Sequence, residues 1–235
     1  MEERHIKFYS KYLDREIELM VFGSWGYPVL MFPSTLGRYY QVKDFGMIDA
    51  VRGMVEAGKV KIFSVDSIDA DSWYGKHLHP AHRVKNYRLY DRFLHHELVP
   101  QILEECRVDR IAVAGCSFGG FHAASYAFRH PDKVAFLMSM SGAFDLKTFM
   151  DGYYDEDFYF FNPVDYMAHE QGWRFGHMQI VLGTSEWDIC LNSNVQMSGI
   201  LNHLGVAHWL NIWGWEKHDW PLWQKMFPEY LARFF

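Results

Sequence analysis

The feature that most restricts the fold is the segment 111–120, which reads Ile-Ala-Val-Ala-Gly-Cys-Ser-Phe-Gly-Gly. An apolar run typical of a buried strand is followed by the pattern G-x-S-x-G and then by a segment of helical character. A nucleophile elbow has this order: a strand ends in a sharp turn, a serine lies at the apex in a strained conformation, and a helix begins directly after it. The glycines at 115, 119 and 120 leave room where the strand and the helix pass closely. The segment therefore predicts Ser117 as a nucleophile, rather than as an ordinary serine in a glycine-rich turn.

Strand-like and helix-like segments alternate along the whole chain. The predicted strands are 16–23, 28–32, 59–65, 110–115, 134–139, 177–183 and 208–213, and the predicted helices are 43–57, 90–106, 118–130, 192–204 and 222–235. Continuous apolar strands such as Ile111–Ala114 and Ile180–Leu182 suit a parallel sheet covered on both faces. No shift in composition marks a domain boundary, and 235 residues suit one large domain. We expect a single α/β domain over 1–235, with a mostly parallel, doubly wound sheet flanked by helices.

A serine nucleophile needs a histidine base and a carboxylate that orients the base, and these follow an elbow serine in the order acid, histidine. Among the 13 histidines, His218 lies directly after the last predicted strand, where its loop can reach the elbow. The alternative is that His218 is an ordinary surface-loop histidine. The loop after the preceding strand offers Asp188, our first choice for the acid, and Glu186. Asp219 suits less well, because a side chain cannot easily face its own neighbour in the chain. The predicted catalytic residues are therefore Ser117, Asp188 and His218.

The third requirement is an oxyanion hole, formed by two N–H donors that face the carbonyl oxygen as it gains charge. The backbone N–H of Phe118, the residue after the nucleophile, is the expected first donor. The second should come from the loop after the strand 28–32, which reads Pro-Ser-Thr-Leu-Gly. Thr35 is the first candidate for this donor and Leu36 the second. Alternatively, this loop is only a turn, since proline and glycine are ordinary turn residues.

Several segments in the second half of the chain carry a family resemblance. They are the elbow 115–120, the segment Phe161-Asn162-Pro163-Val164-Asp165-Tyr166, the run Gly183…Asp188…Asn194…Leu201…Gly205, and His218-Asp219-Trp220 with Trp223. The segment 93–102 also resembles the helix before the nucleophile strand of that family. Residues 90–235 resemble the putative-esterase family of α/β hydrolases, which includes S-formylglutathione hydrolases, feruloyl-esterase-like enzymes and mycolyltransferases. The resemblance implies the α/β-hydrolase fold and the hydrolysis, or transfer, of an acyl group from an ester or thioester.

The family pattern also bears on two of the site predictions. In that pattern an acid stands six positions before an asparagine, and Asp188 stands six before Asn194, which supports Asp188. The family commonly has His-Gly or Asp-Gly before its oxyanion donor, whereas this chain has Pro33-Ser34. This departure leaves the identity of the second donor open.

Aromatic residues make up 18% of the chain, which suits a large aromatic core, an aromatic-lined cleft, or both. Two loop-rich stretches, 66–88 and 145–174, leave the carboxyl ends of predicted strands, where open α/β sheets place their binding sites. The second stretch is expected either to cap the cleft or to be an ordinary surface excursion. The aromatic side chains expected to bind substrate are Trp73, Tyr74, Tyr153, Tyr154 and Trp187. They favour small aromatic or short-chain esters over long lipids.

No metal or other cofactor is expected. The segment with the pattern H-x-H-x-x-H has no acidic or cysteine partner arranged nearby, so we expect a polar loop, which could face the substrate, at His77, His79 and His82. The three cysteines are odd in number and lack metal-binding spacing. Reduced thiols in a cytoplasmic protein are their simplest interpretation.

The charge and hydropathy of the chain exclude two classes of partner. The net charge is −6 and the basic residues are scattered, so neither nucleic acid nor an anionic membrane is expected to bind. No apolar stretch approaches membrane-spanning length. The sequence predicts a cytoplasmic serine carboxylesterase whose partner is a small-molecule ester. The alternatives are an acyltransferase or a peptidase on the same scaffold, or a non-catalytic binding protein with this fold.

Overall fold

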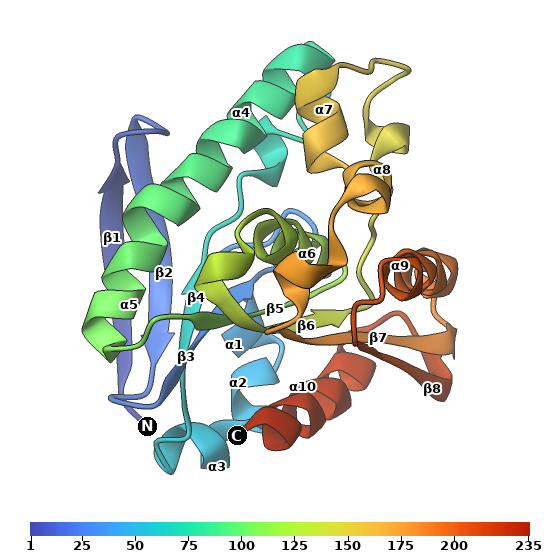
Figure 1. Ribbon diagram of the computed structural model, residues 1–235. Helices are drawn as coiled ribbons and strands as arrows, with labels where there is room; N and C mark the ends of the chain where they lie inside the picture. The colour runs from blue at the N-terminus through green and yellow to red at the C-terminus, as the bar shows by residue number, and fades with distance from the viewer.

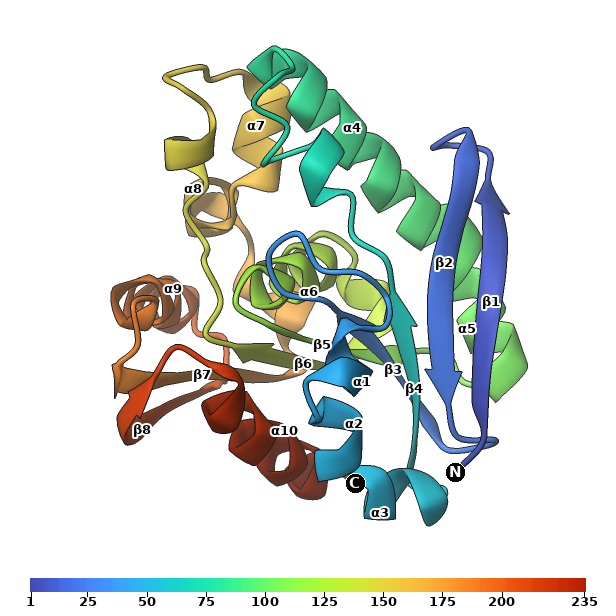
Figure 2. The same cartoon turned by 180° about the vertical axis from the view of Figure 1, so that it is seen from behind.

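The computed structural model describes residues 1–235 and contains one eight-stranded sheet, seen from two sides in Figures 1 and 2. The strands lie side by side in the order β1-β2-β4-β3-β5-β6-β7-β8. β2 runs antiparallel to both of its neighbours, and each pair from β4 to β8 is parallel. The strands are β1 (Glu3–Ser10), β2 (Arg15–Phe22), β3 (Tyr27–Phe32), β4 (Val60–Val65), β5 (Ile111–Cys116), β6 (Val134–Met140), β7 (Gln179–Trp187) and β8 (Trp209–Lys217). The expected mostly parallel α/β sheet is confirmed.

Helices cover both faces of this sheet (Figures 1 and 2). One face carries α1 (Gln41–Asp44), α2 (Met47–Ala50), α3 (Arg52–Glu56) and α10 (Trp220–Phe234). The other carries α4 (Pro80–Phe93), α5 (Val99–Cys106), α6 (Phe118–Arg129), α7 (Glu156–Phe161), α8 (Pro163–Tyr166) and α9 (Leu191–His203). Successive residues of β3 alternate between two buried clusters, with Leu30 and Phe32 facing α6 and Val29 and Met31 facing α10. The sheet is therefore apolar on both faces, as a doubly wound fold requires.

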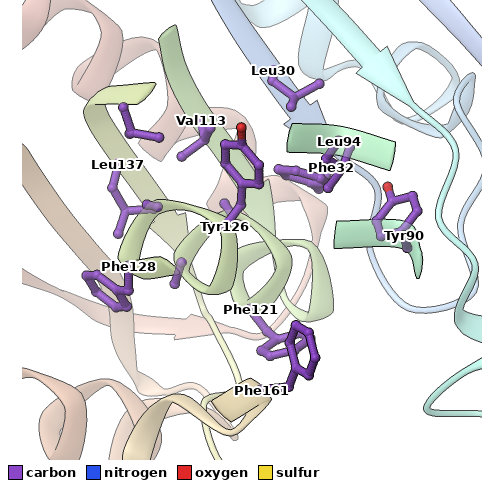
Figure 3. Packing of buried hydrophobic residues seen from close by; sticks show 14 of the residues in the cluster. Leu30, Phe32, Tyr90, Leu94, Val113, Phe121, Tyr126, Phe128, Leu137 and Phe161 are labelled. Atoms are coloured by element: carbon purple, nitrogen blue, oxygen red, sulfur yellow. The ribbon is translucent and has the colours of Figure 1, made fainter. Parts of the chain in front are cut away.

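The core between the sheet and α4–α9 uses much of the aromatic content. Figure 3 shows Phe121, Tyr126 and Phe128 of α6 packed among residues of the neighbouring strands and helices. Of these, Phe121 is completely buried and the other two are almost so. Burial of large aromatic rings contributes strongly to the hydrophobic stabilisation of a domain.

The first strand was not expected from the sequence. β1 pairs antiparallel with β2 along its whole length and forms one edge of the sheet. Its residues alternate between exposed and half-buried, with Ile6 and Phe8 packing on the core. β1 contains several charged residues, so its apolar content is too low for the sequence to resemble that of the interior strands. Its period of two instead fits an edge strand with one solvated face.

Two predicted helices have different boundaries in the structure. The helix expected from 90 begins ten residues earlier, at Pro80, where proline needs no N–H and the His79 side chain accepts a hydrogen bond from the Ala81 N–H. A π-helical turn at Leu94–Leu98 then joins α4 to α5. Pro100 cannot donate a hydrogen bond to the preceding turn, and a π-turn is one way in which a helix accommodates such a gap.

The helix expected over 43–57 is divided into the short helices α1, α2 and α3. Gly46 separates the first two with φ +70°, a left-handed conformation that stops an α-helix. Because the helix is broken at Gly46, α2 can take a separate direction, and it packs against α10. The three other predicted helices correspond to α6, α9 and α10, and the predicted ends lie within two residues of the observed ones.

Candidate active site

Ser117 lies at the turn between β5 and α6, with φ +56° and ψ −120°. This conformation is unfavourable for a residue with a side chain, and the surrounding backbone holds it in place. The Ser117 N–H donates to the Met140 carbonyl at 2.8 Å, and its own carbonyl accepts from the Gly120 N–H at 2.9 Å. A Cβ on Gly119 would overlap the carbonyl oxygens of residues 32 and 33. The local structure is therefore the strand–turn–helix arrangement that the sequence predicts.

The structure joins Ser117, His218 and Asp188 in one chain of hydrogen bonds. The Ser117 Oγ lies 2.8 Å from His218 Nε2, and His218 Nδ1 lies 2.7 Å from Asp188 Oδ1. With the ring proton on Nδ1, His218 donates to Asp188 and accepts from the Ser117 hydroxyl. The three residues come from the ends of β5, β7 and β8, strands that lie on the same side of the sheet centre.

Asp188 is surrounded by groups that favour its charged form. The carboxylate is only 6% exposed, and Oδ1 also accepts a hydrogen bond from the Cys190 N–H at 2.7 Å. Burial acts to raise the pKa of Asp188, but the neighbouring His218 and Ser141 side chains and the Cys190 N–H outweigh it and hold that pKa below its usual value. The alternative acid, Glu186, is exposed and forms no hydrogen bond or ion pair. The geometry therefore distinguishes two carboxylates that the sequence leaves as alternatives.

A tryptophan supports the other side of the histidine. The Trp223 ring meets the His218 ring edge to face, with centroids 5.1 Å apart. The Trp223 Nε1–H donates to the Ser141 Oγ at 2.8 Å, so the indole is fixed in turn. The first turn of α10 thereby orients the imidazole. The family resemblance included Trp223, but it did not predict that this ring contacts His218.

Two backbone N–H groups near Ser117 donate to no protein group. These are the N–H of Phe118, which begins α6, and the N–H of Thr35 on the loop after β3. The first N–H groups of a helix have no partner within the helix. The Leu36 N–H, the other candidate, donates to Asp69 Oδ2 at 2.9 Å. Of the two candidates on this loop, Thr35 therefore has the N–H that remains available.

Tyr74 contacts the side chains of both Phe118 and Thr35, the residues that carry these N–H groups. Its ring meets the Phe118 ring at 5.3 Å between centroids, and its hydroxyl is 3.4 Å from Thr35 Oγ1. The Phe149 ring contacts both Tyr74 and Phe118, so the segment 145–174 reaches the elbow. Sequence reasoning missed Phe149, for which no motif gives a signal.

The expectation that Trp73 lines the cleft is wrong. Its side chain is completely buried and packs against the rings of Tyr87, Phe121 and Phe158. Adjacent residues of an irregular segment can face in opposite directions, and here Tyr74 faces the elbow while Trp73 faces the core. Trp73 is therefore a core residue.

The other predicted aromatic residues, Tyr153, Tyr154 and Trp187, form their side-chain contacts with residues outside the elbow. The Tyr153 hydroxyl donates to Asp155 and its ring contacts His79, and the Tyr154 hydroxyl donates to Asp165. Trp187 is 56% exposed and meets Trp215, which is 69% exposed and which the sequence analysis did not single out. These two indoles line a pocket of about 240 Å³ with Glu216, Lys217, Asp219, Pro221 and Leu222. The pocket adjoins the loop that carries His218.

One group of side chains has the spacing to hold a metal ion. Single ligand atoms of Asp188, Cys190 and His218 lie within 4.8 Å of one another. However, Asp188 and His218 are already hydrogen-bonded, and burial together with the charge of Asp188 raises the pKa of the Cys190 thiol to about 12. The protonated thiol is a poor ligand. In the histidine-rich loop, His79 caps α4 instead.

The elbow, the sheet order and the hydrogen-bonded serine, histidine and aspartate are features of the serine hydrolases with an α/β-hydrolase fold. A family model described as "Putative esterase" matches residues 10–225. The chain belongs to this family and is an enzyme of the serine hydrolase class.

Several solved structures share the fold. A ferulic acid esterase superposes with a TM-score of 0.78 at 17% identity, covering 100% of this chain and 99% of its own. An S-formylglutathione hydrolase from Agrobacterium tumefaciens gives 0.75 at 16% identity, covering 98% and 93%. MPT51 from Mycobacterium tuberculosis gives 0.74 at 13% identity, covering 99% and 98%. A search of curated protein sequences finds no significant match. No helix of the structure is long and apolar enough to cross a membrane.

Proposed function

We propose that the protein is a carboxylesterase that hydrolyses a small acyl ester or thioester through Ser117, His218 and Asp188. The observation that carries the proposal is the continuous hydrogen-bonded chain from Ser117 Oγ to Asp188, with both links shorter than 2.9 Å. It begins at a strained elbow, where a serine side chain is exposed to an approaching substrate.

In the first half of the reaction, the Ser117 Oγ attacks the carbonyl carbon of the ester, and the hydroxyl proton passes to His218 Nε2. The carbonyl oxygen becomes an oxyanion, which accepts hydrogen bonds from the Phe118 and Thr35 N–H groups. The bond to the leaving alcohol or thiol then breaks, and His218 returns the proton to that group. An acyl-enzyme on Ser117 remains.

In the second half, a water molecule attacks the acyl carbon while His218 Nε2 takes one of its protons. The bond to Ser117 Oγ breaks, and the serine recovers the proton as the acid leaves. Asp188 holds the imidazole in the required tautomer and stabilises its positive charge in both halves.

The surroundings of the elbow suit a particular class of substrate. Tyr74 and Phe149 provide aromatic surface beside Phe118, which suits a short or aromatic acyl group. The names of two structural neighbours indicate ferulic acid esters and S-formylglutathione as their substrates, so one is an oxygen ester and the other a thioester. Tyr153, Tyr154 and Trp187 are proposed as more distant contacts of the substrate.

Two further properties belong to the proposal. The chain acts as one domain over 1–235, supported by a sheet that runs from β1 to β8 and by helices that pack on both of its faces. The proposed location is the cytoplasm. Its support is that all three cysteines are free thiols, as is usual in a reducing compartment.

The test is a panel of p-nitrophenyl esters of rising chain length, with matching thioesters and anilides. The proposal expects acetate and butyrate to react faster than long-chain esters, and thioesters to react, while anilides react poorly. Ser117→Ala should reduce hydrolysis by at least about 10³-fold. Preferential cleavage of the anilides would favour a peptidase, and acyl transfer to an added alcohol at the expense of hydrolysis would favour an acyltransferase. Unchanged hydrolysis by Ser117→Ala would refute the proposal.

A further inference from the structure

A second acid–histidine pair lies buried next to the elbow and takes no part in the proposed reaction. The side chains of Asp69 and His122 are both completely buried, and Asp69 Oδ1 lies 2.8 Å from His122 Nε2. The other ring nitrogen lies 3.1 Å from the Tyr87 hydroxyl. With the ring proton on Nε2, His122 donates to Asp69 and accepts from Tyr87, so each group has a partner. The pair is shielded from solvent.

The second oxygen of Asp69 holds the loop after β3. Oδ2 accepts the Leu36 N–H at 2.9 Å. Leu36 has φ +55°, a left-handed conformation that a residue with a side chain keeps only when its surroundings impose it. The Leu36 side chain is 52% exposed, so packing of that side chain supplies little of this restraint. The hydrogen bond to Asp69 therefore constrains the backbone next to Thr35, together with the Gly37 N–H, which donates to the Ser34 carbonyl at 2.8 Å.

The same pair is connected to the other side of the elbow. His122 lies one helical turn after Phe118 on α6, and the two rings meet edge to face at 5.1 Å. The Asp69 carbonyl accepts the Tyr74 N–H at 2.9 Å, and Tyr74 contacts both Thr35 and Phe118. Asp69 thus links the loop that carries one available N–H group to the helix that carries the other.

We propose that Asp69 is a positioning residue, which holds the loop 33–37 in register with the start of α6 so that the Thr35 and Phe118 N–H groups face one point. This inference rests on the proposed function, because it assigns Asp69 a role in stabilising the oxyanion. The oxyanion exists only in the transition state and the tetrahedral intermediates, so loss of this register lowers kcat and leaves KM nearly unchanged.

The chain offers a matched control for the experiment. Asp91 is also a buried carboxylate that pairs with a histidine of the α6 region, His130 at 2.9 Å, and with Arg129 at 3.3 Å. It lies near the opposite end of α6 and contacts no part of the loop 33–37. Asp69→Ala and Asp91→Ala therefore both remove a buried carboxylate from a histidine, but only the first releases Leu36.

With p-nitrophenyl butyrate, Asp69→Ala is expected to lower kcat by about 10- to 100-fold, less than the ~10²–10³-fold typical of deleting an oxyanion donor. Asp69→Asn should recover to within about threefold of wild type, because its amide oxygen can still accept the Leu36 N–H while its NH₂ group faces His122. Asp91→Ala should stay within about twofold. All variants are assayed well below their unfolding temperatures.

A transition-state analogue separates positioning from general loss of structure. Butylboronic acid forms a tetrahedral adduct with an active serine, whereas butyrate is the product of the assay reaction. Asp69→Ala should weaken the boronate by about the same factor as kcat/KM and leave butyrate inhibition unchanged. Should Asp69→Ala fail to fold, replacing the Leu36 amide by an ester removes the same hydrogen bond and leaves the Asp69–His122 pair intact. This replacement should give the same kinetic pattern.

The inference is overturned if Asp69→Ala, or the Leu36 ester, keeps kcat within twofold of wild type, or if Asp91→Ala loses as much activity. It is also overturned if boronate and butyrate weaken equally. A different result would refute the proposed function itself, namely hydrolysis by Ser117→Ala at the wild-type rate.

Discussion

Asp188 and Glu186 stand two residues apart, with Glu186 near the end of β7 and Asp188 directly after that strand, yet their surroundings give them different chemistry. Asp188 is buried, accepts hydrogen bonds from His218 and from a backbone N–H, and has a lowered pKa. Glu186 faces solvent. A carboxylate orients an imidazole only when its own position is fixed, so burial and hydrogen bonding matter more than closeness in sequence.

Asp188→Asn is expected to reduce kcat by about 10²–10⁴-fold, because the amide no longer holds the required tautomer of His218 or stabilises its charge. Glu186→Gln should cost less than about tenfold, because an exposed charge contributes little. Steady-state rates with p-nitrophenyl butyrate measure both effects, with unchanged thermal unfolding as the control. A severe loss in Glu186→Gln together with normal activity in Asp188→Asn would reverse the assignment of the acid.

The lowered pKa of Asp188 also predicts how stability depends on pH. The folded-state pKa lies below the usual value of 3.8, so the unfolded chain binds the proton more readily. The stabilisation is complete well above that value and is lost as the pH falls through the folded-state pKa. The difference in Tm between wild type and Asp188→Asn should therefore change in favour of the variant as the pH falls below about 4. A difference that is the same at pH 3.5 and pH 7 would contradict this.

At the residue scale, the most informative sequence signal was the order of the motifs along the chain, with the serine first, then the acid, then the histidine. The structure joins by hydrogen bonds the three residues that this order singled out, and their catalytic roles remain proposals. The choice between Thr35 and Leu36 could not be made from sequence, because it depends on Asp69, which lies on a distant segment. Trp73 and Tyr74 look alike in sequence, and only the path of the backbone shows which of them faces the core.

At the element scale, the elbow depends on close contact between β5, α6 and the loop after β3. A Cβ on Gly119 would overlap the carbonyl oxygens of Phe32 and Pro33, so no side chain fits between the helix and the end of β3. Close packing of this kind explains why a small change of volume is expected to disturb two elements at once.

Gly119→Ala should lower the free energy of unfolding by about 2–3 kcal/mol, because the new Cβ forces the helix away from the loop. It should also reduce kcat, because both proposed oxyanion donors move. Gly199→Ala is the matched control: Gly199 is exposed within α9, and a Cβ there meets no atom within 4 Å. It should raise stability by about 0.5–1 kcal/mol. Denaturant unfolding measures both variants, and equal effects of the two would refute the steric argument.

The interior strands of the sheet were predictable from sequence, whereas β1 and the short helices were not. Interior strands are continuous apolar runs, which the sequence shows directly. β1 is amphipathic and acquires its conformation by pairing with β2. The division of 43–57 into three helices depends on packing against α10, a contact between segments far apart in the chain. Tertiary contacts overrode local propensity in both places.

At the scale of the whole molecule, the order of strands assembles the site. β3, β5, β7 and β8 are parallel to one another and belong to the adjacent run β3-β5-β6-β7-β8, so their carboxyl ends open on the same edge (Figure 1). The loops that leave this edge carry Thr35, Ser117, Asp188 and His218. Groups more than 180 residues apart in sequence are thereby brought to one place, as open α/β sheets generally do.

The most direct test of the account is covalent labelling with a fluorophosphonate, followed by mass spectrometry of the intact protein and of its peptides. Such a probe reacts with a serine only when a base activates it. The account predicts one adduct per chain, located on Ser117, its absence in Ser117→Ala, and labelling slowed by at least about 10²-fold in His218→Ala. An adduct on another residue, or an equal rate of labelling in His218→Ala, would contradict the central claim.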